Sequence, residues 1–374
     1  GAGNITIADA LSFNNTGAQA ATLSLIADNG IIQNAAITGT GTQLVHISMT
    51  ANGNFQGNTA ASANSQGVAI NAGITTNGNI TLTGEINNGT SGVGINVGAE
   101  VRTTGSTSTT TMTSITGAVS GTGNITTAAN NTGSITINAA EAGTLSGVIS
   151  GGGSLVKQGS GTTRLTATNT YTGTTTISAG TLQIGNGGTT GTLGSGAVSV
   201  AANSNLDFFR SGTTEIQVNN VISSASTGAI NLVGTGVVNE SSYFLGGNNS
   251  NLLGSVNLTS SRLLVNNASQ LGNGDASIHV NSGAGLYVAN TTLNNALTLA
   301  GNGWNEPTGF LGALRFGAAT YAGNITLGAD ARIGAWSSSG NVSGAISGGH
   351  NLDFSSGTGT VHLTNNSNSY AGTT

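Results

Sequence analysis

The sequence predicts an all-β solenoid, in which short strands stack coil upon coil. One short phrase recurs five times, each time as a turn residue, a polar residue and a strand of alternating apolar and polar side chains. Alternation at period two places Ile and Leu on one face of the strand and Thr on the other. A strand this short cannot bury its apolar face alone, so the copies are expected to stack on one another. The five copies are Gly3-Asn-Ile-Thr-Ile7, Gly78-Asn-Ile-Thr-Leu82, Gly123-Asn-Ile-Thr-Thr127, Gly133-Ser-Ile-Thr-Ile137 and Gly323-Asn-Ile-Thr-Leu327.

The composition favours the same fold class. Glycine accounts for 62 of the 374 residues. Charged residues are only 5% of the chain, against about 25% in ordinary globular proteins. A single proline and the lack of a Gly-X-Y period exclude collagen. Disordered chains combine low hydrophobicity with high net charge, whereas this one has a mean hydropathy of +0.09 and a net charge of −5. Gly and Asn are expected at the corners, because both tolerate positive φ.

The first 143 residues contain short alternating strands rich in Thr, Asn and Ala. Examples are Ala21–Ala27, Val68–Asn71 and Gly94–Val97. The run from Thr103 to Thr113 is almost all Ser, Thr and Gly, and it is compatible with either a loop or a Thr-rich strand.

A longer repeat begins near residue 144 and returns near the end of the chain. A decayed copy lies between, from Val221 to Gly236. We therefore predict two regions of β-helix, residues 1–143 and residues 144–374. The matching stretches are Val148–Leu155 with Ala345–Leu352, and Thr170–Thr175 with Ser369–Thr374.

The two ends of the chain suggest a piece of a longer protein. The later copy of the repeat stops at Thr374, at a point where the earlier copy continues to Ile184. No charged stretch followed by an apolar run opens the chain, as a signal peptide would require. We expect the natural protein to extend beyond this chain.

Two stretches carry a resemblance to a known family. Residues 145–161 (Leu-Ser-Gly-Val-Ile-Ser-Gly-Gly-Gly-Ser-Leu-Val-Lys-Gln-Gly-Ser-Gly) and residues 169–185 resemble the passenger-associated transport repeat of bacterial autotransporters. The first 143 residues are similar to filamentous-haemagglutinin-type adhesins, through phrases such as Gly73–Leu82. The first resemblance implies a right-handed parallel β-helix that type V secretion carries across the outer membrane to the surface of a Gram-negative bacterium.

Several kinds of chemistry have no support in the sequence. Cysteine is absent, so thiolate metal sites and thiol nucleophiles are excluded. The seven cations are scattered, whereas nucleic acids and anionic membranes need a cluster. No apolar run approaches the length of a membrane span, so we expect no membrane insertion. We expect no cofactor, no metal site and no catalytic residue. The cations are Arg102, Lys157, Arg164, Arg210, Arg262, Arg315 and Arg332.

A glycan-cleaving enzyme is the first alternative, because such enzymes need neighbouring carboxylates, or a carboxylate with a cation, on one face. The close pairs in sequence are Asp207 with Glu215 and Asp330 with Arg332. Residues that are distant in sequence can also meet in a solenoid, so spacing alone leaves this alternative open.

The segment 304–336 differs from the rest of the chain in holding both tryptophans and the only proline. Exposed aromatic rings beside arginine are suited to contacts with glycans or proteins. The candidate ligand contacts are Trp304, Trp336, Arg315 and Tyr321. In the alternative interpretation, these side chains fill a wider coil or pack under a loop.

We expect the chain to act as a bacterial surface adhesin, in attachment or cell-cell aggregation, or as the stalk of an adhesin. The partner would be a host or bacterial surface glycan, a surface protein or a second copy of the chain. The second alternative is an inert spacer.

Overall fold

A computed structural model describes residues 3–52, 67–86 and 92–374. It is a parallel β-solenoid of about 14 coils with about 2% helix, which confirms the predicted fold class. The chain divides into two compact units. Unit 1 comprises residues 1–185 and 190–197, and unit 2 comprises residues 186–189 and 198–374.

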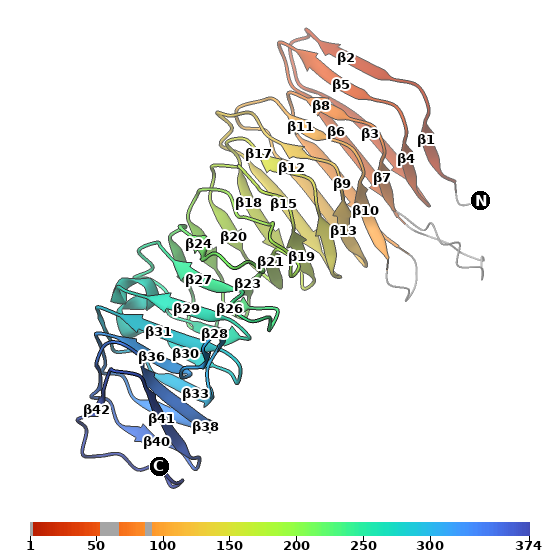
Figure 1. Cartoon of the computed structure of the whole chain (residues 1–374). Helices are drawn as coiled ribbons and strands as arrows, with labels where there is room; N and C mark the ends of the chain where they lie inside the picture. The colour runs from red at the N-terminus through yellow and green to blue at the C-terminus, as the bar shows by residue number, and fades with distance from the viewer. Residues whose placement is uncertain (1–2, 53–66, 87–91) are drawn as a thin grey trace, which may run out of the picture. The chain divides into compact units, whose positions relative to one another are not determined.

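The strands of unit 1 form three stacks in which all neighbours are parallel (Figure 1). The first stack is β1 (Ile5–Ile7), β4 (Ile31–Gln33), β7 (Val68–Ile70), β10 (Val93–Val97), β13 (Ala118–Gly121), β16 (Gly143–Leu145), β19 (Thr162–Leu165) and β21 (Thr181–Ile184). The second stack is β2 (Leu11–Asn15), β5 (Ile37–Gly41), β8 (Ile74–Thr76), β11 (Val101–Thr103), β14 (Ile125–Thr126) and β17 (Ile149–Ser150). The third stack is β3 (Ala21–Ala27), β6 (Val45–Ala51), β9 (Ile80–Gly84), β12 (Thr110–Ser114), β15 (Ser134–Ala139), β18 (Ser154–Gln158) and β20 (Thr175–Ile177).

Unit 2 also has three parallel stacks. Its first stack is β23 (Asn205–Phe209), β26 (Ala229–Val233), β28 (Ser255–Thr259), β30 (Ser277–Val280), β33 (Leu297–Gly301), the first part of β38 (Ile325–Ala335) and β40 (Ile346–Ser347). Its second stack is β24 (Ile216–Val218), β27 (Ser242–Leu245), β29 (Arg262–Val265), β31 (Gly285–Ala289), β36 (Leu314–Gly317), the later part of β38 and β41 (Leu352–Ser356). Its third stack is β32 (Thr292–Leu293), β37 (Ala319–Tyr321), β39 (Gly340–Val342) and β42 (Val361–Leu363).

Four further strands and one helix complete unit 2. Strands β22 (Val198–Val200) and β25 (Ile222–Ser224) pair in parallel. Strands β34 (Asn305–Glu306) and β35 (Gly309–Phe310) form an antiparallel hairpin. The 3-10 helix η1 spans Ala268–Gly274. No helix in the described part of the chain is long and apolar enough to span a membrane.

The recurring phrase behaves as predicted within each strand. Ile80, Ile125, Ile135 and Ile325 are buried, and the Thr that follows each of them is not. The expectation that the five copies stack on one another is wrong. Two copies lie in the third stack of unit 1, one in its second and one in its first, and the last lies in the first stack of unit 2. The phrase therefore marks the start of a strand on any of the faces.

The Asn of the phrase has a different role from the predicted one. None of these Asn residues has a positive φ. Instead, each Asn side chain accepts a hydrogen bond from a backbone N–H of the next coil, directly before the next strand of its stack. The pairs are Asn4 with Gly30, Asn79 with Thr109, Asn124 with Val148 and Asn324 with Ala345, at N···O distances of 3.1, 2.9, 2.9 and 3.2 Å.

The Gly of the phrase allows two coils to approach closely. A Cβ atom on Gly123 would lie 2.1 Å from the carbonyl oxygen of Ala99 in the preceding coil. A Cβ on Gly323 would lie 1.9 Å from the carbonyl oxygen of Asn295. Both distances are far inside contact distance, so these corners exclude a side chain because of the neighbouring coil.

The Thr-rich run and the predicted region boundary can also be placed. The run from Thr103 to Thr113 contains both predicted alternatives, since β11 ends at Thr103, a turn follows, and β12 begins at Thr110.

The first stack continues across the predicted boundary at residue 143, because β13 pairs with β16, which begins at that residue. The boundary therefore remains a prediction about the type of repeat on each side of it.

Candidate binding surfaces

Two of the four predicted ligand contacts lie in the interior of unit 2. Tyr321 is 0% exposed, and its hydroxyl donates to the carbonyl oxygen of Asn295 at 2.9 Å. Trp304 is 3% exposed, and its indole N–H donates to the carbonyl oxygen of Glu240 at 3.0 Å. Neither ring can reach a ligand at the surface. This corrects the prediction that they are contacts and agrees with the alternative, in which these side chains fill a wider coil or pack under a loop.

Arg315 takes part in a cluster that holds the β34–β35 hairpin against the second stack. Its Nη1 atom lies 2.6 and 2.7 Å from the two carboxylate oxygens of Glu306. The guanidinium of Arg262 lies 4.6 Å from the ring centroid of Trp304, within range of a cation–π contact. Burial lowers the pKa of the Arg262 guanidinium, and Glu306 opposes this shift. The cluster therefore fixes the hairpin, with both guanidinium groups directed at the single carboxylate of Glu306.

Trp336 is the one predicted contact with an exposed aromatic ring, at 44%. It follows the end of β38, and its carbonyl oxygen accepts hydrogen bonds from Thr358 N–H (2.8 Å) and Gly359 N–H (3.1 Å). Its role as a ligand contact remains a prediction.

The third stack of unit 1 presents two long rows of mostly Ser and Thr side chains, interrupted by Val156 in one row and Ile26 in the other, which we call the hydroxyl face. The strand register aligns these residues coil after coil, and they alternate with the buried positions of the same strands. Row one is Ser24, Ser48, Thr81, Thr111, Thr136, Val156 and Thr176. Row two is Ile26, Thr50, Thr83, Thr113, Asn138 and Gln158.

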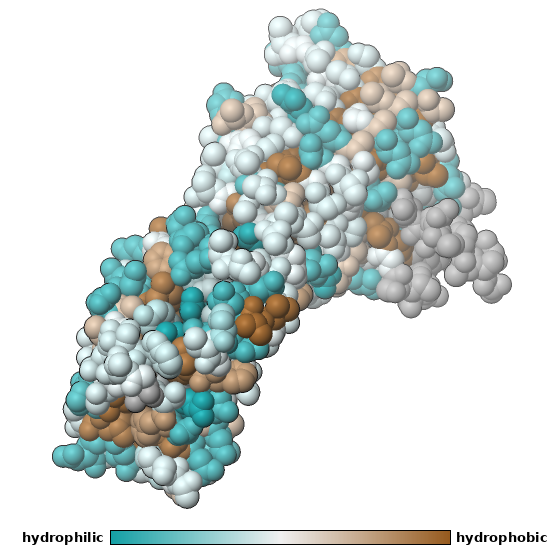
Figure 2. Space-filling model, viewed as in Figure 1, coloured by the Kyte–Doolittle hydropathy of each residue, from teal (hydrophilic) through white to brown (hydrophobic). Residues whose placement is uncertain are grey.

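The hydroxyl face is a regular, uncharged array. Neighbours along a row are one strand spacing apart, about 4.8 Å, and the two rows are two residues apart along each strand, about 6.8 Å. Neither row contains Asp, Glu, Lys or Arg. Much of the surface of unit 1 in Figure 2 is white, the colour of residues with near-neutral hydropathy. The sequence indicates the Thr-rich strands but not their alignment, because alignment depends on the length of each coil.

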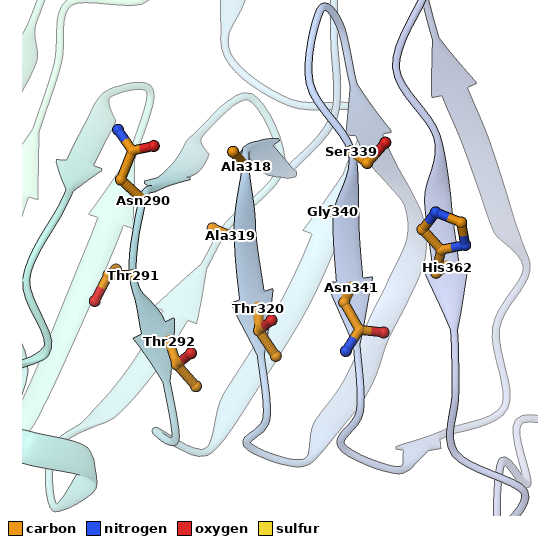
Figure 3. Close-up of a pocket in the computed structure, with 10 residues that line it drawn as sticks. All are labelled: Asn290, Thr291, Thr292, Ala318, Ala319, Thr320, Ser339, Gly340, Asn341 and His362. Carbon is orange, nitrogen blue, oxygen red and sulfur yellow. The ribbon is translucent and has the colours of Figure 1, made fainter.

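A second polar surface lies on the third stack of unit 2, where a groove of about 600 Å³ opens (Figure 3). Its long wall is the aligned row Thr292, Thr320, Asn341 and His362. The residues that line it are uncharged except when His362 is protonated.

The residues of the two pairs suggested by sequence spacing, Asp207 with Glu215 and Asp330 with Arg332, form hydrogen bonds or ion pairs with other residues. Asp207 accepts a hydrogen bond from Asn231 at 2.5 Å, and Glu215 accepts one from Gln217 at 2.7 Å. Burial raises the pKa of the Asp207 carboxyl, and the Asn231 hydrogen bond opposes this shift. Arg332 pairs with Asp353 at 2.6 Å. In the described part of the chain, no three His, Asp or Glu side chains are placed to hold a metal ion.

Lys157 is a buried cation in the core of unit 1, at an inward position between Ile137 and Ile177. Its Nζ atom donates to the carbonyl oxygens of Gln158, Gly159 and Ala179, at 2.7, 2.8 and 3.2 Å. Burial lowers the pKa of this amine to about 8. Because Ala179 belongs to the next coil, Lys157 links two coils from inside.

An Asn at a corner recurs in the longer repeat, buried in the first two copies and half-buried in the last. Its side-chain oxygen accepts a hydrogen bond from the backbone N–H of the Ile in each Ile-Ser pair of the repeat. The decayed middle copy keeps this bond although its sequence has drifted. The three pairs are Asn169 with Ile149, Asn249 with Ile222 and Asn368 with Ile346, at 2.8, 2.7 and 2.9 Å.

A Tyr–Thr pair is the second shared feature of the first and last copies. The hydroxyl of Tyr171 is hydrogen-bonded to that of Thr175, and the hydroxyl of Tyr370 to that of Thr374. In both copies the Tyr stands two residues after the corner Asn. The two copies therefore form the same local structure.

The comparisons with known proteins agree with this repeat. A family model described as the passenger-associated-transport-repeat matches residues 155–184 and 356–374. No curated protein and no solved structure matches the chain. The similarity of the first 143 residues to filamentous-haemagglutinin-type adhesins is not shown. Two matched repeats on a parallel β-solenoid support an autotransporter passenger domain.

Proposed function

We propose that this chain is displayed on the surface of a Gram-negative bacterium and acts there as an adhesin, with the hydroxyl face as a site of self-association between cells. Export across the outer membrane is what passenger repeats imply. The observation that carries the adhesive role is the hydroxyl face itself, a regular two-row surface without a formal charge.

The chemistry of the hydroxyl face is self-complementary. Each Thr or Ser hydroxyl both donates and accepts hydrogen bonds, so the same surface on a second copy can pair with it. A charged surface would repel its own copy, and this surface has no such repulsion. Two copies related by a two-fold axis would meet through the same patch, as in most symmetric dimers.

The expected association is weak for each pair of molecules. A typical hydrogen bond contributes only about 1 kcal/mol net, because water competes for the same groups. Useful adhesion then requires many copies on one cell, where the second contact becomes effectively intramolecular. Salt should have little effect, since long-range steering needs clustered charge.

The test is clumping of beads or cells that carry the chain at high density, with and without a charged hydroxyl face. The variant Ser48→Lys/Thr136→Lys places two cations in row one, and two such faces then repel each other. The control Thr38→Lys/Ser150→Lys adds the same charges at half-buried, outward positions of the second stack. We expect the first variant to abolish clumping and the control to retain it.

Two outcomes would contradict the proposal. Equal loss of clumping in both variants would show a general effect of charge. A wild-type surface that does not clump at any density would leave the chain as a spacer.

A further inference from the structure

The groove on the third stack of unit 2 has a composition suited to a particular class of ligand. Its lining combines hydroxyl, amide and imidazole groups with the small residues Ala318, Ala319 and Gly340. Among the described residues, the hydroxyls of Thr292 and Thr320 and the ring of His362 have no recorded hydrogen bond to the protein. Figure 3 shows these three side chains, together with Asn341, on four successive strands along the same surface. The groove therefore offers donors and acceptors that are free to bind a ligand.

Two residues at the entry to this stack adopt a costly backbone conformation. Asn290 and Ala318 have φ values of 54° and 58°. Asn290 lies two residues before β32, Ala318 lies directly before β37, and both line the groove. The left-handed region is unfavourable for an L-residue, and Ala, unlike Asn, has no polar side chain to compensate. Strain of this kind is often found where a surface has a function. The unfavourable backbone conformation of Ala318 is therefore what we expect of a corner residue that lines a binding groove.

The charge of the groove excludes two ligand classes. No Lys or Arg lines it, so an anionic ligand finds no counter-ion there. No Asp or Glu lines it either, so a cationic ligand is equally unfavoured. The two arginines of the hairpin cluster are engaged by Glu306, and Arg332 is paired with Asp353. A neutral ligand with many hydroxyl groups fits best.

Trp336 adds the apolar contact that such a ligand needs. It lies three residues before Ser339, which lines the groove, and its ring packs at Gly357, in the coil that supplies His362. A sugar ring has hydroxyls at its edge and C–H groups on its faces, and an exposed indole can stack on those faces. Trp336 thus lies at the corner between the second stack and β39, the strand that supplies Asn341 to the groove. The Oδ1 atom of Asn341 accepts a hydrogen bond from Thr364 at 3.1 Å, which leaves its amide N–H groups as the donors for a ligand.

We propose that this groove binds a short, uncharged oligosaccharide, with Thr320, Asn341 and His362 hydrogen-bonding the sugar hydroxyls and Trp336 packing at the rim. Four strands span about 14 Å, which suits a few linked sugar rings. The inference rests on the proposed adhesin function and names a ligand class for it. It uses a surface distinct from the hydroxyl face, so the two can fail independently.

The experiment titrates the full chain with neutral trisaccharides of glucose, galactose, mannose or N-acetylglucosamine, and with sulfated counterparts, by calorimetry and by ligand-detected NMR. We expect at least one neutral sugar to bind, with Kd of about 1 mM. Thr320→Val/Asn341→Leu should weaken binding about tenfold or more, because each lost hydrogen bond removes about fivefold. Trp336→Ala should reduce the NMR contact signal of the sugar C–H protons.

The matched control is Thr298→Val/Thr326→Val, two outward threonines on the first stack of the same unit. It should bind like the wild type. Equal loss in the control, preference for the sulfated sugars, or no binding of any sugar would overturn the groove assignment. If no sugar binds but beads still clump through the hydroxyl face, the groove inference fails and the adhesin function stands. If a sugar binds and the beads do not clump, the oligosaccharide site in the groove is supported and self-association through the hydroxyl face is contradicted.

Discussion

At the scale of single residues, corner side chains connect the coils of this solenoid. The Asn residues of the short phrase and of the longer repeat accept backbone N–H groups from neighbouring coils. Strand pairing ends at each corner, so backbone groups there need another partner, and an unpaired buried group costs free energy. A side-chain amide supplies that partner without occupying a strand position.

The first prediction concerns the buried corner Asn169. Asn169→Ala removes the acceptor of the Ile149 N–H and the donor to the Thr192 carbonyl oxygen. Each orphaned buried group costs about 1–3 kcal/mol. We expect a lower urea midpoint and faster hydrogen exchange at Ile149, measured by mass spectrometry. The control Asn124→Ala removes an exposed corner bond and should have a smaller effect. Equal effects would show that burial of the corner is unimportant.

The second prediction concerns Lys157 and pH. Burial lowers the pKa of its amine from 10.5 to about 8 in the folded protein. Between these values the unfolded chain holds a proton that the folded chain has released, so stability rises with pH in this interval. The gain is at most about 1.4 kcal/mol per pH unit.

The measurement compares unfolding midpoints of the wild type and Lys157→Met from pH 7 to 9.5. Above pH 8 the unfolding midpoint of the wild type should rise relative to that of Lys157→Met. The other titrating groups are common to both proteins and cancel in the difference. Parallel curves would mean that the amine is not desolvated.

At the scale of elements, the β34–β35 hairpin determines which aromatic residues are exposed. The hairpin interrupts the solenoid between β33 and β36 and carries Trp304 beneath it, over Arg262. Trp336 lies at an ordinary corner and has no such cover. Two tryptophans that the sequence places in one outlier segment therefore have opposite environments.

The third prediction uses this contrast, since the chain has only two Trp residues. Trp336→Phe leaves Trp304 as the only indole, and we expect blue-shifted emission that acrylamide quenches weakly. Trp304→Phe leaves Trp336, and we expect red-shifted emission that is quenched strongly. Similar quenching of both variants would mean that the hairpin does not cover Trp304.

At the scale of the whole molecule, stability depends on aliphatic packing and hydrogen bonds and little on charge. Charged residues are 5% of the chain. The ion pairs of the described residues join Arg262 and Arg315 to Glu306, and Arg332 to Asp353, with a weaker His350–Asp330 contact. The more exposed Arg332–Asp353 and His350–Asp330 contacts contribute little, and the partly buried Glu306 cluster is screened less by salt than an exposed pair.

The fourth prediction follows from this sparse charge. Salt shortens the Debye length from about 30 Å at 0.01 M to about 3 Å at 1 M and so screens exposed charges. We expect the thermal unfolding midpoint to change little between these two NaCl concentrations. A large shift in either direction would reveal an electrostatic contribution that these ion pairs do not provide.

The sequence by itself determined the all-β class and, within the alternating strands, which side chains point inward and which outward. These properties are local, because alternation at period two assigns Ile80 to the core and Thr81 to the surface without reference to the rest of the chain. It also identified the repeat of residues 144–185, whose local bonds the structure confirms.

Only the tertiary structure decided which stack each strand joins and which distant residues meet. Ser48, Thr81 and Thr111 form one row because corners and loops of unequal length bring their strands into register. That register depends on contacts between coils, which no short stretch of sequence contains. For the same reason the burial of Trp304, the exposure of Trp336 and the groove beside His362 could not be predicted. Each results from the packing of one coil on the next.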